Sequence, residues 1–331
     1  MGKTILIIWT FITLLVYGSI LISPRDIEFI GLVGFAIPVF VMVNLVFSLF
    51  AWIYSWKAKW VVSLLVLIAW PFYGFIFQLN AKDVEDVNGL KVMSQNLMRF
   101  NHKSESPFTQ FEKIIDTEQP DVMLLQEFAA TKRYRSGILE KLAYKEALGG
   151  YANSFAVYSK YPILNSGVLF KQSETNNIQF ADLQIGMDTI RVYNLHLQSM
   201  GINPKKLNSP SATQDDIEAI SLKFTTASKI RSIQMETLLS HIDSCNYPII
   251  VAGDFNDIPF SNNYFKLKRR LNNSFQSKGQ GIGATFNAGL PFLRIDNQFY
   301  SDDIQLLAFK TFNKTFFSDH FPLIGIYNLS P

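Results

Sequence analysis

Polar and ionisable side chains recur at the ends of apolar, strand-like runs in the later part of the sequence. Besides Glu127, the run ends carry Asn194, His196, Asp254, Asn256, Asp296, Asp319 and His320. Because a sheet presents the ends of its strands to a cleft, these side chains can meet at one site. Carboxylate and amide oxygens suit Mg²⁺ or Mn²⁺, and the two histidines supply proton transfer. Together they predict a hard-cation site beside an acid–base pair, although each fragment alone also fits a solvated strand end or a helix cap.

Zinc is disfavoured, because the chain has a single cysteine, Cys245, and no closely spaced pair of histidines. One cysteine also excludes an intramolecular disulfide framework. His102 lies in a polar stretch and His241 in an amphipathic helical stretch. We interpret both as surface residues.

The elements that must position the candidate residues follow from the apolar pattern after residue 89. Short apolar runs bounded by Gly, Pro, Asn and Asp are typical of strands. Six of them cover 90–98, 121–127, 177–185, 189–197, 247–255 and 322–329. Many strands with few helices indicate paired sheets covered by helices, in one domain over 90–331.

Three helices are predicted in this domain. One begins at Pro107, with Ser106 as its N-cap, and is stopped by Pro120. The others cover 230–242 and 262–271. Residues 201–226 lack clear periodicity, so we predict a long loop there that serves as a lid or recognition element.

The first 80 residues form a segment of a different kind. Uncharged apolar runs cover 4–23, 29–56 and 60–79, and each has the roughly 20 residues that a helix needs to cross a bilayer. We predict a membrane anchor of three transmembrane helices over 1–80, followed by a polar linker over 81–89. A cleaved signal peptide is disfavoured for the first run, because it lacks a small-x-small cleavage site and two further runs follow.

Charges in the short connections predict the orientation of this anchor. Lys57 and Lys59 are the only charges of the second connection, whereas the first carries both signs. The positive-inside rule places the Lys57/Lys59 connection and the N-terminus in the cytoplasm, and three spans then put the second domain outside. We predict a multi-pass protein of the bacterial inner membrane with an extracytoplasmic domain, since nothing resembles a eukaryotic targeting signal. The spans lack ionisable residues, which argues against a transporter or channel.

Charge and composition exclude two other classes of protein. Lys and Arg number 30 against 27 Asp and Glu, a net charge of +3. A strongly basic nucleic-acid binder needs a larger surplus to displace counterions. Apolar residues make up 48% and charged residues 17%, which excludes a mostly disordered chain.

Taken in order, the fragments resemble the motifs of the endonuclease/exonuclease/phosphatase superfamily. This group includes pancreatic deoxyribonuclease, abasic-site endonucleases, inositol-phosphate 5-phosphatases and neutral sphingomyelinases. The matching fragments are SQN with Asn96, LLQE with Glu127, YSKYPI at 158–163, NLHL with His196, GDFN at 253–256, RID with Asp296 and SDH at 318–320. They run from about Leu90 to Leu329 and leave the anchor uncovered. The resemblance implies an α/β (α+β) fold, a four-layer sandwich with two central mixed β-sheets.

The resemblance also implies how a metal would be held. Glu127 would be the main Mg²⁺ ligand, with Asn96 helping directly or through water. Asp319 would be a second acidic group near the metal. Asp254 would orient the attacking water or bind a second metal.

The remaining matched residues would act on the proton and the phosphate. His320 would be the general base that activates water, and Asp296 would accept its other ring N–H. His196 would donate to a non-bridging phosphate oxygen, and Asn256 would hold the phosphate. Asn297 departs from the family pattern, in which an aromatic residue often follows the aspartate. This departure affects the substrate contacts expected on that side of the site.

Three hypotheses for function remain open at this point. A phosphodiester hydrolase for lipid head groups or related phosphoesters fits the anchor, which would hold the cleft near the bilayer. A tethered nuclease fits the superfamily equally well, and the cluster Lys266, Lys268, Arg269 and Arg270 would contact nucleic acid. A membrane scaffold that binds phosphates without turnover is the third.

Overall fold

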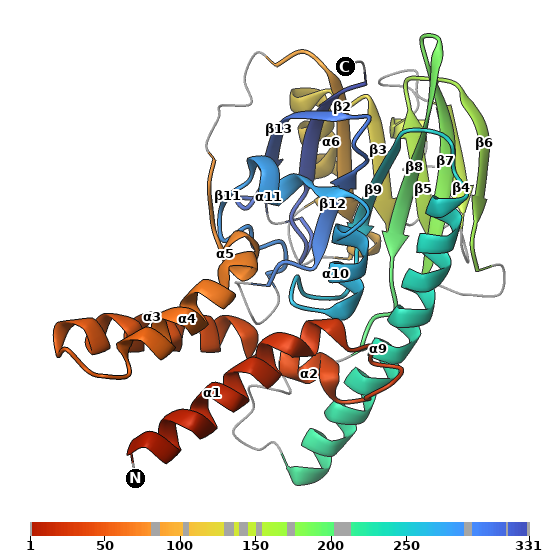
Figure 1. The fold of residues 1–331 in the computed structure, drawn as a ribbon. Helices are drawn as coiled ribbons and strands as arrows, with labels where there is room; N and C mark the ends of the chain where they lie inside the picture. The colour runs from red at the N-terminus through yellow and green to blue at the C-terminus, as the bar shows by residue number, and fades with distance from the viewer. Residues whose placement is uncertain are drawn as a thin grey trace.

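The computed structural model describes residues 2–80, 87–101, 106–128, 136–138, 145–149, 154–170, 176–201, 213–287, 293–315 and 317–329. Its centre is a pair of six-stranded sheets that pack face to face (Figure 1). Helices cover the outer face of each sheet. The apolar segment at the N-terminus packs against one end of this sandwich.

The first sheet has the strand order β13–β14–β2–β3–β5–β4. Its strands cover β2 Leu90–Asn96, β3 Val122–Gln126, β4 Lys145–Gly149, β5 Phe155–Ser159, β13 Gln305–Thr311 and β14 Leu323–Asn328. Only β2 and β3 are parallel. Helix α6, Pro107–Glu118, buries Phe111 and Ile115 against the outer face. It begins at the predicted proline, but Ser106 makes no side-chain cap.

The second sheet has the strand order β10–β12–β9–β8–β7–β6. Its strands cover β6 Ile163–Val168, β7 Asn177–Ile185, β8 Asp188–His196, β9 Ile249–Asp254, β10 Asn272–Asn273 and β12 Asp296–Tyr300. Only β8 and β9 are parallel. Helices α9, Gln214–Asp243, and α10, Asn262–Lys268, cover its outer face. Short elements complete the domain: η2 Met98–Phe100, α11 Ser274–Lys278 and β11 Gln280–Gly281.

Apolar side chains from both sheets fill the space between them. Leu124 and Val157 of the first sheet pack with Val192 and Ile250 of the second. With α6 on one outer face and α9 and α10 on the other, the layers run helix, sheet, sheet, helix. The prediction of an α/β sandwich with two mixed sheets is therefore confirmed.

The loop predicted over 201–226 is wrong for its second half. Helix α9 begins at Gln214, inside the predicted loop, and continues through the predicted helix at 230–242. Thr213 caps it by accepting from the backbone N–H of Asp216, whose carboxylate accepts from the backbone N–H of Thr213. Such reciprocal capping fixes the start of a helix. Residues 202–212 lie outside the described residues.

His241 is half-buried, so its interpretation as a surface residue is wrong. Its Nδ1 lies 2.8 Å from the Tyr193 hydroxyl, and its ring packs on Phe180. Burial lowers the pKa of His241, and the charge of nearby Arg191 lowers it further. His241 thus joins α9 to the second sheet. His102 lies outside the described residues.

The N-terminal segment contains two helices that are long and apolar enough to cross a membrane, Lys3–Leu21 and Ile30–Ile53. The first comprises α1, Gly2–Gly18, and η1, Ser19–Leu21; the second comprises α2, Ile30–Gly34, and α3, Ile37–Ile53. Both match predicted spans.

The third predicted span is not a continuous helix. It consists of α4, Lys59–Ile68, and α5, Trp70–Ile76, with a bend of 58° between them. Pro71 lies in the first turn of α5, where a proline lacks the backbone N–H needed to continue the preceding helix. Beyond α5, Gln78–Leu79 forms β1 and pairs with β11 of the sandwich. The prediction of three transmembrane helices is therefore corrected: two helices are long and apolar enough to cross a membrane, and a third crossing would require the bent pair α4–α5 to form one span.

Candidate active site

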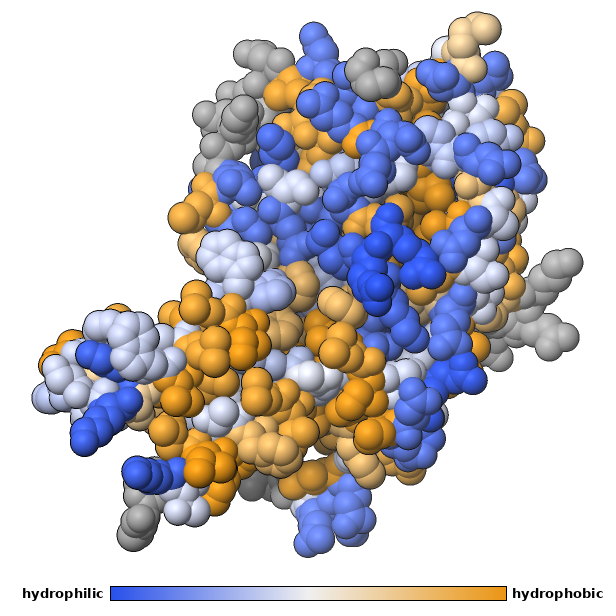
Figure 2. All heavy atoms as spheres, viewed as in Figure 1, coloured by the Kyte–Doolittle hydropathy of each residue, from blue (hydrophilic) through white to orange (hydrophobic). Residues whose placement is uncertain are grey.

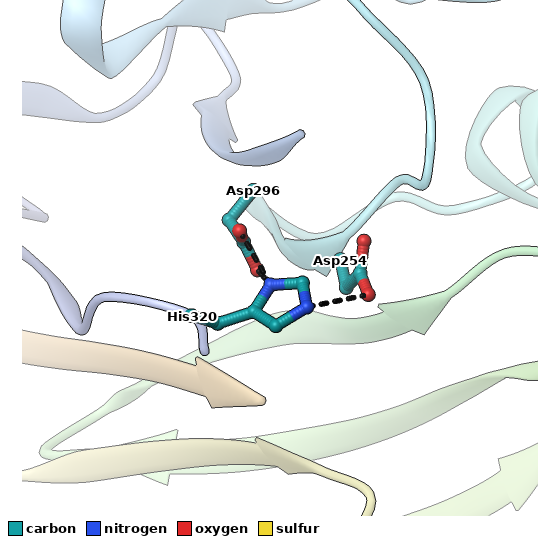
Figure 3. Close-up of side chains that lie close together, drawn as sticks. All are labelled: Asp254, Asp296 and His320. Atoms are coloured by element: carbon teal, nitrogen blue, oxygen red, sulfur yellow. Dashed lines mark hydrogen bonds and ion pairs between the residues drawn. The ribbon is translucent and has the colours of Figure 1, made fainter. Parts of the chain in front are cut away.

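Three buried side chains form the closest group of potential ligands. Asp254 ends β9, Asp296 begins β12 and His320 precedes β14, and their ligand atoms lie within 4.8 Å of one another (Figure 3). Asp254 and Asp296 are register partners across the antiparallel β9–β12 pair, which explains how residues far apart in sequence meet. His320 reaches them from the opposite sheet. The site thus lies where the two sheets meet.

His320 is held between the two aspartates. Its Nδ1 lies 2.9 Å from Asp296 Oδ2, and its Nε2 lies 3.8 Å from Asp254 Oδ2 (Figure 3). Thr285 Oγ1 accepts from the backbone N–H of Asp296, and Gln95 Nε2 donates to the backbone carbonyl of His320. These bonds fix both partners. This geometry leaves Nε2 as the ring nitrogen that can take a proton.

The charges around His320 favour its protonated form. Burial alone would lower its pKa, but the carboxylates of Asp296 and Asp254 outweigh burial and raise it. Burial raises the pKa of Asp296, and His320 opposes that shift. The pair therefore stabilises the imidazolium that forms when His320 takes a proton, as a general base requires.

Asn96, Glu127 and His196 extend the site toward the first sheet. Asn96 Nδ2 lies 3.3 Å from Glu127 Oε1 and 3.1 Å from Asp254 Oδ2. His196 Nε2 lies 3.6 Å from Glu127 Oε1 and 3.7 Å from Asp254 Oδ2. These residues come from the carboxyl ends of the parallel pairs β2–β3 and β8–β9. The structure therefore brings the predicted metal and phosphate residues together with the acid–base pair.

Two site residues have an unusual backbone conformation. Glu127 has φ 47° and Asn256 has φ 48°, in the left-handed region that non-glycine residues seldom adopt. Asn256 is held there because its N–H donates to Asp254 Oδ1 and its side chain donates to the Leu197 carbonyl, at 2.8 and 3.0 Å. Such conformations cluster at functional sites because they aim a side chain where regular structure cannot.

Three residues that the sequence analysis singled out lie outside the group around His320. Asp319 is not in the close group; its carboxylate lies 3.4 Å from Ser318 Oγ. Asn194 accepts from Gln126 at 2.6 Å between the sheets, so its role is structural. Asn297 is buried, and side chains alternate along a strand, so it faces away from the site that Asp296 faces. The departure from the family pattern at Asn297 therefore lies on the face of β12 opposite to the one that carries Asp296.

Two supporting residues escaped sequence reasoning. Thr285 holds the backbone of Asp296, and Asn176 Nδ2 lies 3.3 Å from His196 Nε2. Neither residue follows an apolar run, so the pattern of polar residues at strand ends does not identify them. Asn176 directly precedes β7, which pairs with β8, and this position is the one sequence feature that could have indicated its role.

The donor set fits a divalent cation. Glu127, Asp254 and Asp296 place three carboxylates around one site, and within the described ranges no lysine or arginine forms an ion pair with any of them. Asp254 and Asp296 are buried, and buried carboxylates without such partners are costly unless a cation, the His320 imidazolium or a metal ion, neutralises them. Oxygen ligands of this kind suit Mg²⁺ or Mn²⁺.

The chain belongs to the Endonuclease/Exonuclease/phosphatase family, whose sequence profile matches residues 93–320. Members of this family are metal-dependent phosphoesterases and nucleases. A second profile, described as a domain of unknown function, matches residues 3–75. Among proteins with curated descriptions, none matches.

Several solved structures share the fold at low sequence identity. The catalytic domain of human Nocturnin with bound sulfate is 17% identical, with a TM-score of 0.53 over 72% of this chain and 93% of that one. TDP2 of D. rerio, complexed with single-strand DNA product, is 16% identical, with a TM-score of 0.54 over 73% and 100%. A family member from Bacteroides vulgatus is 15% identical, with a TM-score of 0.54 over 74% and 100%. These similarities cover the sandwich and establish its fold.

Proposed function

We propose that this protein is a membrane-anchored, Mg²⁺-dependent phosphoesterase that hydrolyses phosphodiester bonds in phospholipid head groups. One observation carries the proposal: the segment that follows Asn256 packs directly on the anchor. Ile258 and Phe260 are buried in the same apolar cluster as Phe72 and Phe75 of α5. A Cβ on Gly34 of α2 would lie 2.8 Å from the Phe260 carbonyl oxygen, so only glycine permits this approach.

The anchor has the surface that a bilayer requires. Apolar side chains gather over α1 to α5, whereas polar side chains cover much of the sandwich (Figure 2). Trp9, Tyr17 and Asn44 satisfy one another inside the helix bundle, with Asn44 bonded to both aromatic side chains. Interhelical polar contacts of this kind hold membrane helices together. The active site is thus built on a segment that membrane helices fix in place.

The site residues have complementary roles in the proposed reaction. A bound cation, held by Glu127 with Asn96 and Asp254, would neutralise charge that develops on the phosphate. His320 takes the proton of the attacking water through Nε2, and Asp296 stabilises the resulting imidazolium. His196 donates to a phosphate oxygen, and Asn256 lies beside Asp254, where it would hold the phosphate. Asp319 supplies further negative charge beside His320.

A nuclease is disfavoured because its proposed basic contact is partly neutralised. Lys266 Nζ lies 3.4 Å from Glu236, and Arg270 pairs with Asp243 at 3.0 Å. Only Lys268 and Arg269 of that cluster remain without a described ion pair. Binding to a nucleic-acid backbone depends on unpaired cations that displace counterions.

Substrate preference is tested with the full chain in detergent micelles and Mg²⁺. Phosphatidylglycerol–phosphatidylethanolamine micelles and plasmid DNA are supplied together, and head-group release and DNA nicking are measured in the same sample. We expect head-group release with intact DNA, and no release by His320→Ala. Nicked DNA with intact lipid would establish the nuclease instead, and no cleavage of either would favour the scaffold hypothesis.

We also propose that the sandwich lies outside the bacterial inner membrane. The connection between the first two apolar helices contacts α9 of the sandwich through the ion pairs Arg25–Glu236 and Lys229–Glu28. The α3–α4 turn, with Lys57 and Lys59, lies at the far end of the anchor (Figure 1). The two connections are therefore on opposite sides, as the positive-inside rule requires.

A C-terminal reporter fusion tests this orientation. A reporter enzyme that is active only in the cytoplasm, fused after Pro331, is expected to be inactive, while the same reporter fused in the Lys57/Lys59 connection is expected to be active. Activity from the C-terminal fusion would reverse the orientation.

A further inference from the structure

A cavity lies between the anchor and the sandwich, apart from the site residues described above. Its volume is about 170 Å³, comparable to a cavity of about 150 Å³ that binds benzene in another protein. Phe35 and Pro38 of the second apolar helix form one wall, and Phe75 of α5 forms another. Ile258 and Leu293 of the sandwich complete it. Most of its lining is therefore apolar, and four of its ten lining residues come from the apolar N-terminal helices.

Arg294 brings a positive charge to this cavity. It is 4% exposed, and within the described ranges no carboxylate forms an ion pair with it. Two backbone carbonyls, of Phe75 and Ile282, accept from its terminal nitrogens, and its guanidinium packs on the Phe275 ring. A buried cation without a counter-ion is expensive, so an anion there would be stabilising.

The hydroxyl of Tyr264 interacts with Arg294 but does not line the cavity. Burial raises the pKa of Tyr264 to about 12, and a hydrogen bond with Arg294 and the charge of Arg294 oppose that shift. A phenol with this pKa is neutral near pH 7, so Tyr264 supplies no counter-charge, and the charge of Arg294 remains available to an anion in the cavity.

We propose that this cavity binds an anionic phospholipid from the bilayer, with an acyl chain against the apolar walls and a head-group oxygen at Arg294. The membrane helices that contribute to the lining would give a bilayer lipid direct access. The proposal rests on the membrane location proposed above, but not on the proposed hydrolysis, because binding is measured without turnover.

The cavity shares a wall with the active site. Leu293 lines the cavity, and its carbonyl accepts from the backbone N–H groups of Thr285 and Phe286. Thr285 holds the backbone of Asp296, and the Phe286 ring contacts His320 at 5.0 Å between centroids. A lipid in the cavity would therefore pack against the segment that positions the acid–base pair.

The proposal is tested by thermal unfolding of the full chain in dodecyl maltoside micelles, without divalent cation. Dioctanoyl phosphatidylglycerol is expected to raise Tm by about 2–6 °C at saturating concentration. Dioctanoyl phosphatidylcholine has the same chains but no net charge, and it is expected to give less than half of that shift.

Two variants and a control locate the binding site. Leu293→Phe fills the cavity and should abolish the shift, whereas the control Ile217→Phe enlarges an exposed side chain of α9 and should retain it. Arg294→Met should lose the preference for phosphatidylglycerol entirely; if it fails to fold, Leu293→Phe decides. Equal shifts with both lipids, or an unchanged shift in Leu293→Phe, would overturn the proposal.

Discussion

Replacing His320 with alanine is expected to reduce phosphoester turnover by more than about a hundredfold, the contribution typical of a general base. Asp296 holds Nδ1 of the His320 imidazole, and Nε2 therefore remains available to accept a proton. Alanine leaves the metal residues Asn96 and Glu127 in place, so substrate binding should change less than the rate. Initial rates at saturating substrate and Mg²⁺ measure the effect.

The pH dependence of this variant distinguishes a lost base from a damaged fold. His320 must be neutral to accept a proton, and its pKa is raised by Asp296 and Asp254 against the effect of burial. The wild-type rate should therefore rise with pH through neutrality, and His320→Ala should lose that rise. His241→Gln, which changes a histidine remote from the site, is the matched control and should keep both rate and profile. Near-normal turnover by His320→Ala would contradict the assignment.

Removing the divalent cation is expected to abolish activity, and Mg²⁺ is expected to restore it. The sharper test is Glu127→Gln, which keeps the size of the side chain but removes its charge. Loss of a residue that only supports a metal ligand costs about 10–100-fold in metal affinity. Loss of a direct ligand should reduce metal affinity at least as much, so the Mg²⁺ concentration for half-maximal activity should rise by more than about tenfold.

Glu118→Gln provides the control for this experiment. Glu118 pairs with Lys310 at the end of α6, away from the site, and its replacement should leave the Mg²⁺ dependence unchanged. An unchanged dependence in Glu127→Gln would show that Glu127 is not a ligand. The ion would then have to be held by the close group of Asp254, Asp296 and His320.

The sheets and the site were predictable because their signals are local. The run at 177–185 is β7 residue for residue, and the runs at 90–98 and 189–197 contain β2 and most of β8. Asp254 and His196 each end a buried strand, where a polar residue after an apolar run is visible in sequence. Because parallel strands end at the same edge of a sheet, polar residues at the ends of such strands can be predicted to lie close together.

Features that depend on distant contacts were not predictable. The first half of α9 presents a weak apolar pattern because it packs against the anchor; Phe224, for example, contacts Phe35. The bend at Pro71 carries Phe75 onto the sandwich, where Arg294 donates to its carbonyl oxygen. Thr285 acts through backbone bonds that leave no trace in residue pattern. Each of these depends on how the anchor and the sandwich meet.

Phosphorus NMR of phosphatidylglycerol vesicles that contain the full chain tests the central claim most directly. Hydrolysis of the head-group phosphodiester by wild-type protein with Mg²⁺ is expected to replace the diester signal with a phosphomonoester signal, whereas vesicles with His320→Ala should keep the diester signal. A diester signal that persists in wild-type vesicles, while the same preparation hydrolyses DNA, would contradict the account.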